Sequence, residues 1–153
     1  FREAVPRIRE MCEARGAKVA ALLYPLLNQD LRPGHYDDFL PMHRLFAETF
    51  QGAGIPFLDL YPAMSSCDPV RLQSIPMLDP HPSEIANRIA AEETLLFLID
   101  QGLVDRAYMP SRLADTRLVP KWHKKLEALG QLPPHASAAG DAAAGVADDS
   151  EDR

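Results

Sequence analysis

Two short apolar runs, separated by a segment with helical periodicity, most constrain the fold of this chain. The runs cover residues 18–24 and 55–60, and glycine and proline residues bound them. Continuous apolar runs of this length are typical of strands buried on both faces, as in a parallel sheet. Residues 2–15 and 36–51 place apolar side chains at helical spacing, so the order is helix, strand, helix, strand. That alternation predicts an α/β fold with a parallel sheet covered by helices.

The chain continues with a proline-rich stretch and a long helix. Residues 61–82 hold five prolines and are predicted to form a long irregular loop. Residues 83–101 are predicted to form the clearest helix, with Ser83 as its N-cap. Residues 95–99 are apolar on every face of that helix, which predicts cover on several sides. A further short amphipathic helix is expected over residues 119–129.

Composition separates residues 132–153 from the rest of the chain. They are rich in Ala, Gly, Asp and Pro and cannot bury enough apolar surface to offset the entropy lost on ordering. Their five acidic side chains against Arg153 give a net charge of −4, so residues 1–131 carry only −2 of the total of −6. We therefore predict one domain over residues 1–131 and a disordered tail over residues 132–153. The nearly neutral domain has no basic stripe, which argues against binding to nucleic acid.

The start of the sequence and its cysteines say little about the compartment. No signal peptide is evident, and no stretch approaches the roughly 18 apolar residues that a membrane helix needs. Residues 1–15 have the pattern of the middle of a fold, so we expect this chain to be a fragment of a longer polypeptide. The two cysteines, Cys12 and Cys67, are compatible with free thiols or with one disulfide bridge.

Asp79 and His81 are the side chains that the sequence places best for acid–base chemistry. They stand two residues apart directly before the long helix, and Pro80 and Pro82 stiffen the backbone around them. A carboxylate can hold one ring nitrogen of the imidazole and leave the other to accept a proton, which is the orienting half of a Ser-His-Asp arrangement. We therefore predict that the two side chains face the same side of their loop, at the edge of the sheet. Asp-Pro and His-Pro are also common turn dipeptides, so a purely structural role is the alternative.

Other polar residues fit structural roles. Ser65 and Ser66 are not enclosed in a Gly-x-Ser-x-Gly motif, which favours turn residues over a nucleophile. His43 falls on or beside the apolar face of a predicted helix, which favours a place in the core. The histidines at other positions show no metal-ligand spacing. Residues 28–30 follow the first predicted strand and could line a site or form a solvated loop.

The Asp/His segment also resembles a known protein family. The last conserved block of the SGNH/GDSL hydrolase superfamily, in which an Asp and a His precede a terminal helix, is similar to the segment Leu78-Asp-Pro-His-Pro-Ser-Glu-Ile-Ala-Asn-Arg-Ile-Ala-Ala-Glu92. The predicted order of elements over residues 2–101 is similar to the second half of these enzymes, while the specific motif covers residues 78–90. Many members place the Asp three residues before the His, whereas that position is Leu78 here.

The resemblance implies a three-layer α/β/α fold with a flavodoxin-like parallel sheet, which is incomplete in this chain. It implies ester hydrolysis through an acyl-enzyme, with His81 as the general base and Asp79 as its orienting carboxylate. No cofactor or metal is implied, and the substrate would be a small-molecule ester or an acylated carbohydrate. The blocks that carry the family's nucleophilic serine and oxyanion-hole residues do not occur in this sequence. Two alternatives stay open: a non-catalytic binding module of the same ancestry, and a carbohydrate O-acetyltransferase that uses the same His and Asp.

Overall fold

Two parallel strands form the centre of the computed structural model, which describes residues 1–110, 113 and 117–118. Strand β1 (Ala21–Leu23) pairs with β2 (Phe57–Asp59), and Ala21 lies opposite Phe57. Helix α2 (Leu40–Gly52), preceded by the short helix η1 (Asp37–Phe39), connects the two strands. The predicted alternation of helix and strand and the parallel pairing are therefore confirmed, and the fold is a mixed α/β structure.

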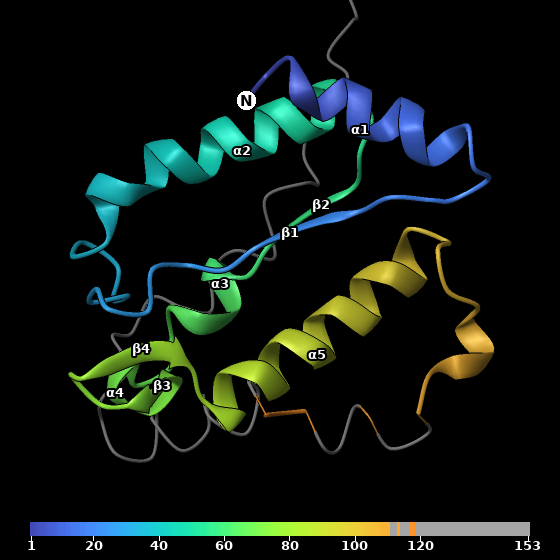
Figure 1. The fold of residues 1–153 in the computed structure, drawn as a ribbon. Coiled ribbons are helices and arrows are strands. Elements are labelled where there is room, and N and C mark those ends of the chain that lie inside the picture. The colour runs from blue at the N-terminus through green and yellow to red at the C-terminus, as the bar shows by residue number, and fades with distance from the viewer. Residues whose placement is uncertain (111–112, 114–116, 119–153) are drawn as a thin grey trace, which may run out of the picture.

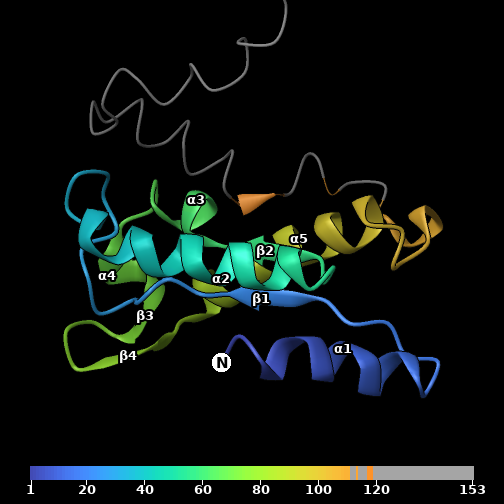
Figure 2. The ribbon, with the colours of Figure 1, turned by 90° about the horizontal axis from the view of Figure 1, so that it is seen from above.

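Helices lie on both sides of the strand pair (Figure 1). Helices α1 (Ala4–Glu13) and α2 lie on one side, and α5 (Glu84–Asp100) lies on the other. Gly16 and Gly54 follow α1 and α2, each with a φ of 67°, a backbone conformation that favours glycine at helix ends. Figure 2 shows that α1 runs along the side of β1 that faces away from β2.

The prediction of an irregular loop over residues 61–82 is wrong. This segment forms two one-turn helices and a β-hairpin: α3 (Tyr61–Met64), α4 (Pro69–Leu72), β3 (Gln73–Ile75) and β4 (Asp79–Pro82). Strands β3 and β4 pair in antiparallel orientation, apart from the β1–β2 sheet. The prolines occupy the first turns of α3 and α4, the hairpin turn and strand β4. In the helix starts the missing N–H costs little, so proline there marks an element rather than a loop.

The main core lies between α5, the α3–α4 segment and the connection that follows β1. Leu60, Met64 and Leu72 are fully buried there, together with Ile89 of α5. The connection over residues 26–35, which is rich in polar residues, also contributes: Leu27 and Leu31 are 5% and 0% exposed. This connection is therefore anchored to the core by two of its leucines.

Helix α5 agrees with its prediction at its start and largely at its end. The Ser83 hydroxyl accepts the Ala86 N–H at 3.2 Å, which confirms the N-cap. Residues 95–99 span every face of the helix and are all partly buried, so this end is covered on several sides, though not completely, within the described structure. The short helix η2 (Arg106–Tyr108) follows. The predicted helix over residues 119–129 and the tail over residues 132–153 lie outside the described residues.

Both cysteines are free, and burial raises the pKa of the Cys67 thiol to about 11. None of the helices in the described part of the chain combines the length and apolarity needed to cross a bilayer.

Candidate functional site

The β3–β4 hairpin presents Asp79 and His81. Asp79 lies opposite Ile75 in the hairpin, and a tight turn connects the two strands. In this turn the Leu78 N–H donates to the Ile75 carbonyl oxygen at 3.1 Å. Proline follows Ile75 and Met77 has a φ of 65°, which are the features of a type II turn with an unusual non-glycine residue at its third position. Both candidate residues therefore lie on β4, a strand of the separate hairpin, rather than in the predicted loop at the edge of the parallel sheet.

The Asp79 carboxylate is in direct contact with the His81 imidazole, as predicted. Asp79 Oδ1 accepts a hydrogen bond from His81 Nδ1 and another from the His81 backbone N–H, the latter at 3.0 Å. Alternate residues of a strand point to the same face, which explains why a spacing of two residues brings them together. Because an ionised carboxylate can only accept, Nδ1 carries the proton and Nε2 is the basic nitrogen.

The electrostatics of this pair favour an ionised carboxylate beside an available imidazole. The pKa of Asp79 is lowered from its ordinary value, first by the His81 backbone N–H and then by the His81 side chain. The His81 side chain is 83% exposed, so Nε2 is accessible to solvent. A neutral imidazole held in this tautomer can accept a proton from a hydroxyl group that approaches it.

Ser83 links the hairpin to the start of α5. Its hydroxyl donates to the Arg71 carbonyl oxygen at 2.6 Å while it caps α5, and its backbone N–H donates to the Leu72 carbonyl oxygen at 2.9 Å. The hydroxyl thus donates one hydrogen bond and accepts another, and both have a structural role. Ser65 bonds to the nearby Pro62 carbonyl oxygen at 3.2 Å, which agrees with the turn role predicted for it.

A second histidine–aspartate pair, not foreseen from the sequence, lies inside the protein. His43 Nδ1 is 2.9 and 3.0 Å from the two Asp59 carboxylate oxygens, and His43 Nε2 is 3.1 Å from the Tyr36 hydroxyl. The Tyr36 hydroxyl in turn accepts the Leu26 N–H at 2.8 Å. This network joins α2, β2 and the connection after β1. The sequence signals were a histidine on an apolar helix face and an acidic residue within an apolar strand.

Donors and acceptors in this buried network match in one arrangement. Asp59 can only accept, so His43 Nδ1 donates and Nε2 accepts the Tyr36 hydroxyl proton. Burial raises the pKa of Tyr36, which keeps its hydroxyl protonated. His43 is 3% exposed and Tyr36 is fully buried, so no substrate reaches either group. The prediction of a core position for His43 is confirmed, and the network is structural.

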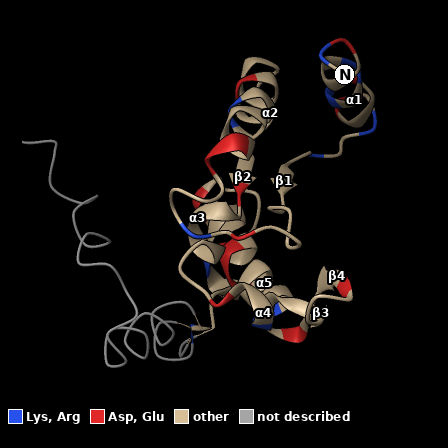
Figure 3. Ribbon diagram, turned by 90° about the vertical axis from the view of Figure 1, so that its left-hand side faces the viewer, with Lys and Arg blue, Asp and Glu red and all other residues tan. Residues whose placement is uncertain are grey.

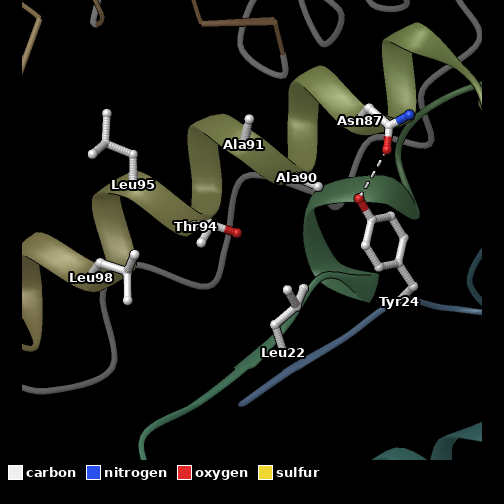
Figure 4. A pocket seen from close by; sticks show the side chains of 8 residues that line it. All are labelled: Leu22, Tyr24, Asn87, Ala90, Ala91, Thr94, Leu95 and Leu98. Atoms are coloured by element: carbon white, nitrogen blue, oxygen red, sulfur yellow. Dashed lines mark hydrogen bonds between the residues drawn. The ribbon is translucent and has the colours of Figure 1, made fainter. Parts of the chain in front are cut away.

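An apolar groove runs between β1 and α5 (Figure 4). Its volume is about 420 Å³, and it is lined mostly by aliphatic side chains: Leu22, Tyr24, Asn87, Ala90, Ala91, Thr94, Leu95 and Leu98. At one end the Tyr24 hydroxyl donates to Asn87 Oδ1 at 3.4 Å. Asn87 Nδ2 donates to the Pro82 carbonyl oxygen at 3.3 Å, so this end of the groove adjoins the strand that carries His81.

Within residues 1–110, 113 and 117–118, no three His, Cys, Asp or Glu side chains are grouped as ligands for a metal ion. Comparison with protein-family models, with curated proteins and with solved structures found no match to this chain.

Proposed function

We propose that this chain is the C-terminal part of an SGNH-type ester hydrolase in which His81 is the general base and Asp79 orients it. The contact between Asp79 and His81 at the start of α5 carries the proposal. It occurs in the segment whose sequence resembles the family, and it leaves Nε2 open to solvent. The nucleophilic serine is supplied by residues outside this sequence.

The proposed reaction has two halves, both served by His81 Nε2. In the first half, Nε2 takes the serine hydroxyl proton as the serine oxygen attacks the ester carbonyl, and the proton passes to the leaving alcohol as the acyl-enzyme forms. In the second half, Nε2 takes a proton from water, which attacks the acyl-enzyme, and returns it to the serine oxygen. Asp79 holds the Nδ1–H throughout and stabilises the imidazolium formed in each half. The scheme requires no metal or organic cofactor.

The open edge of β1 supports the proposal at the level of the sheet. The Ala21 N–H donates to Pro56 and the Leu23 carbonyl oxygen accepts from Leu60, at 2.9 and 3.0 Å. Because alternate residues of a strand direct their backbone groups to opposite sides, the polar groups of Leu22 point away from β2. No other strand of the described structure pairs along that side of β1.

The surroundings of this edge suit a further strand with apolar side chains on both faces. One face of such a strand would lie against the groove along α5. The other face would lie against α1 (Figures 2 and 3). The Ile8 and Met11 side chains of α1 are exposed. A parallel strand placed there would extend the sheet between helices, giving the proposed three-layer α/β/α arrangement. Its carboxyl end would lie near Tyr24 and Asn87, and α/β proteins place their sites at the carboxyl ends of strands.

The experiment compares variants of the full-length gene product in the hydrolysis of a chromogenic short-chain ester. His81→Ala is expected to lower kcat by at least about 10³-fold, because the general base is lost. Asp79→Asn is expected to lower kcat as well, since the tautomer is no longer fixed. His35→Ala serves as the matched control: this histidine is also exposed and lies 3.5 Å from a carboxylate, Asp30, and its removal should leave kcat unchanged.

Full turnover in His81→Ala would overturn the proposal. Residues 1–153 alone should give no enzymatic turnover, because the nucleophile and the oxyanion donors are missing. Turnover by this chain that disappears in His81→Ala would place the nucleophile within these residues, and Ser65 and Ser66 would be the first to replace.

A further inference from the structure

One side-chain amide joins the hairpin that carries Asp79 and His81 to the connection after β1. Gln73 Nε2 donates to the Leu27 carbonyl oxygen at 2.6 Å, and Gln73 Oε1 accepts the Met77 N–H at 2.8 Å. Leu27 is one of the two buried leucines that anchor the connection to the core. The amide therefore connects the turn of the hairpin to the backbone of Leu27, which is held by the core.

The turn needs such support because of its backbone conformation. Met77 has a φ of 65°, the one positive φ among the described non-glycine residues. Side chains disfavour this region, and residues held in it are commonly found at functional sites. Met77 and Leu78 are also the most exposed large apolar residues of the described structure, so packing does little to hold the turn. The hydrogen bond from the Met77 N–H to Gln73 Oε1 therefore restrains the turn, which packing does not.

We infer that Gln73 is a positioning residue of the proposed hydrolase. This inference rests on the proposed function. The Asp79–His81 contact is local and needs no outside help, since both groups lie on one strand two residues apart. What Gln73 fixes is the position of this pair relative to the carboxyl end of β1, where the proposed strand would bring the nucleophile. At the base of the hairpin, Ser83 and Asn87 provide comparable links.

Two substitutions at this position separate the two hydrogen bonds. Gln73→Leu removes both polar atoms at similar size, and Gln73→Glu keeps an acceptor for Met77 but loses the donor for Leu27. Gln51→Glu, exposed near the carboxyl end of α2, is the matched control for the change of charge. The measurements, on the full-length gene product, are kcat, KM, the pH profile of kcat/KM, the melting temperature and the amide exchange rate at Met77.

Gln73→Leu is expected to lower kcat by about ten- to a hundredfold, since a displacement near 1 Å of a catalytic group has this effect. The limb of the pH profile that reports the His81 base should stay in place, because the Asp79 contact is intact. Exchange at Met77 should accelerate in Gln73→Leu and less so in Gln73→Glu. A merely structural role would lower the melting temperature and leave kcat per folded molecule unchanged.

The outcomes distinguish this inference from the function it rests on. If His81→Ala abolishes turnover and Gln73→Leu lowers kcat while Gln51→Glu does not, the inference holds. If His81→Ala abolishes turnover and both Gln73 variants keep the parent kcat, the inference is overturned and the proposed function stands. If His81→Ala leaves turnover unchanged, or the parent protein has none, both are overturned.

Discussion

At the scale of single residues, burial separates two histidine–aspartate pairs with the same chemistry. In each pair a carboxylate accepts from His Nδ1 and thereby makes Nε2 the acceptor. At His43 the acceptor nitrogen is enclosed and receives a tyrosine proton, whereas at His81 it faces solvent. Geometry alone does not distinguish a catalytic base from a structural histidine. Access of solvent and substrate to Nε2 does distinguish them, and this access is the basis of the role proposed for His81.

The buried pair makes a prediction about stability. Tyr36→Phe removes the donor to His43 Nε2 and the acceptor for the Leu26 N–H. Leaving buried polar groups without partners typically costs about 1–3 kcal/mol, so the free energy of unfolding should fall by that amount. Urea unfolding measures it. Tyr108→Phe, at an exposed position of η2, is the control and should change stability by less than about 0.5 kcal/mol. Equal effects of the two substitutions would contradict a stabilising network.

At the scale of elements, the hairpin and α5 act together through Ser83. The hydroxyl of this residue caps α5 and also bonds to α4, and its N–H bonds to the end of α4. The short elements α3, α4 and β3–β4 lack the length to be stable alone, since isolated hairpins and single helical turns are marginal in water. Their packing against α5 keeps them ordered, and this order places Asp79 and His81 at the start of that helix.

Ser83→Ala tests this connection. The substitution removes the N-cap of α5 and the bond to Arg71, and loss of a cap typically costs about 1 kcal/mol, up to about 2. Thermal unfolding should show a correspondingly lower melting temperature. Ser65→Ala, which removes a hydroxyl bonded only to a nearby backbone oxygen among the described contacts, should have a much smaller effect. A melting temperature for Ser83→Ala that matches Ser65→Ala would show that Ser83 is not the connection.

At the scale of the whole molecule, the main feature is the side of β1 that faces away from β2, where no strand of the described structure pairs with the backbone groups of β1. A two-stranded parallel sheet is unusual, because parallel sheets are generally buried on both faces. The apolar groove along α5, with Leu22 47% exposed at its side, and the exposed side chains of α1 lie on the two faces beyond this edge. All three features are explained together by one further strand, which is the arrangement proposed above.

Hydrogen exchange at two adjacent backbone amides tests this arrangement. In residues 1–153 alone, the Ala21 amide, bonded to Pro56, should exchange slowly, whereas the Leu22 amide at the open edge should exchange fast. In the full-length gene product both amides should be protected, because the added strand accepts from Leu22. NMR gives the rates residue by residue. An unprotected Leu22 amide in the full-length protein would contradict a further strand at β1.

The elements whose signal is local could be predicted from the amino-acid sequence. Apolar spacing identified α1, α2 and α5 and the two strands, and a serine before an apolar helix identified the N-cap, because each depends on residues a few positions apart. The contact between Asp79 and His81 was predictable for the same reason. The β3–β4 hairpin was missed, since its prolines are typical of loops and only pairing across the turn shows them to be compatible with strands.

Which polar groups are buried together and which remain accessible to solvent depends on tertiary packing. His43 contacts Asp59 across 16 positions, and Gln73 reaches Leu27 across 46. No local sequence pattern encodes these long-range contacts, because they depend on how α2 crosses from β1 to β2 and on where the hairpin packs. Burial then turns one histidine into a structural residue and leaves the other accessible, because a group acts on a substrate only if the substrate can reach it.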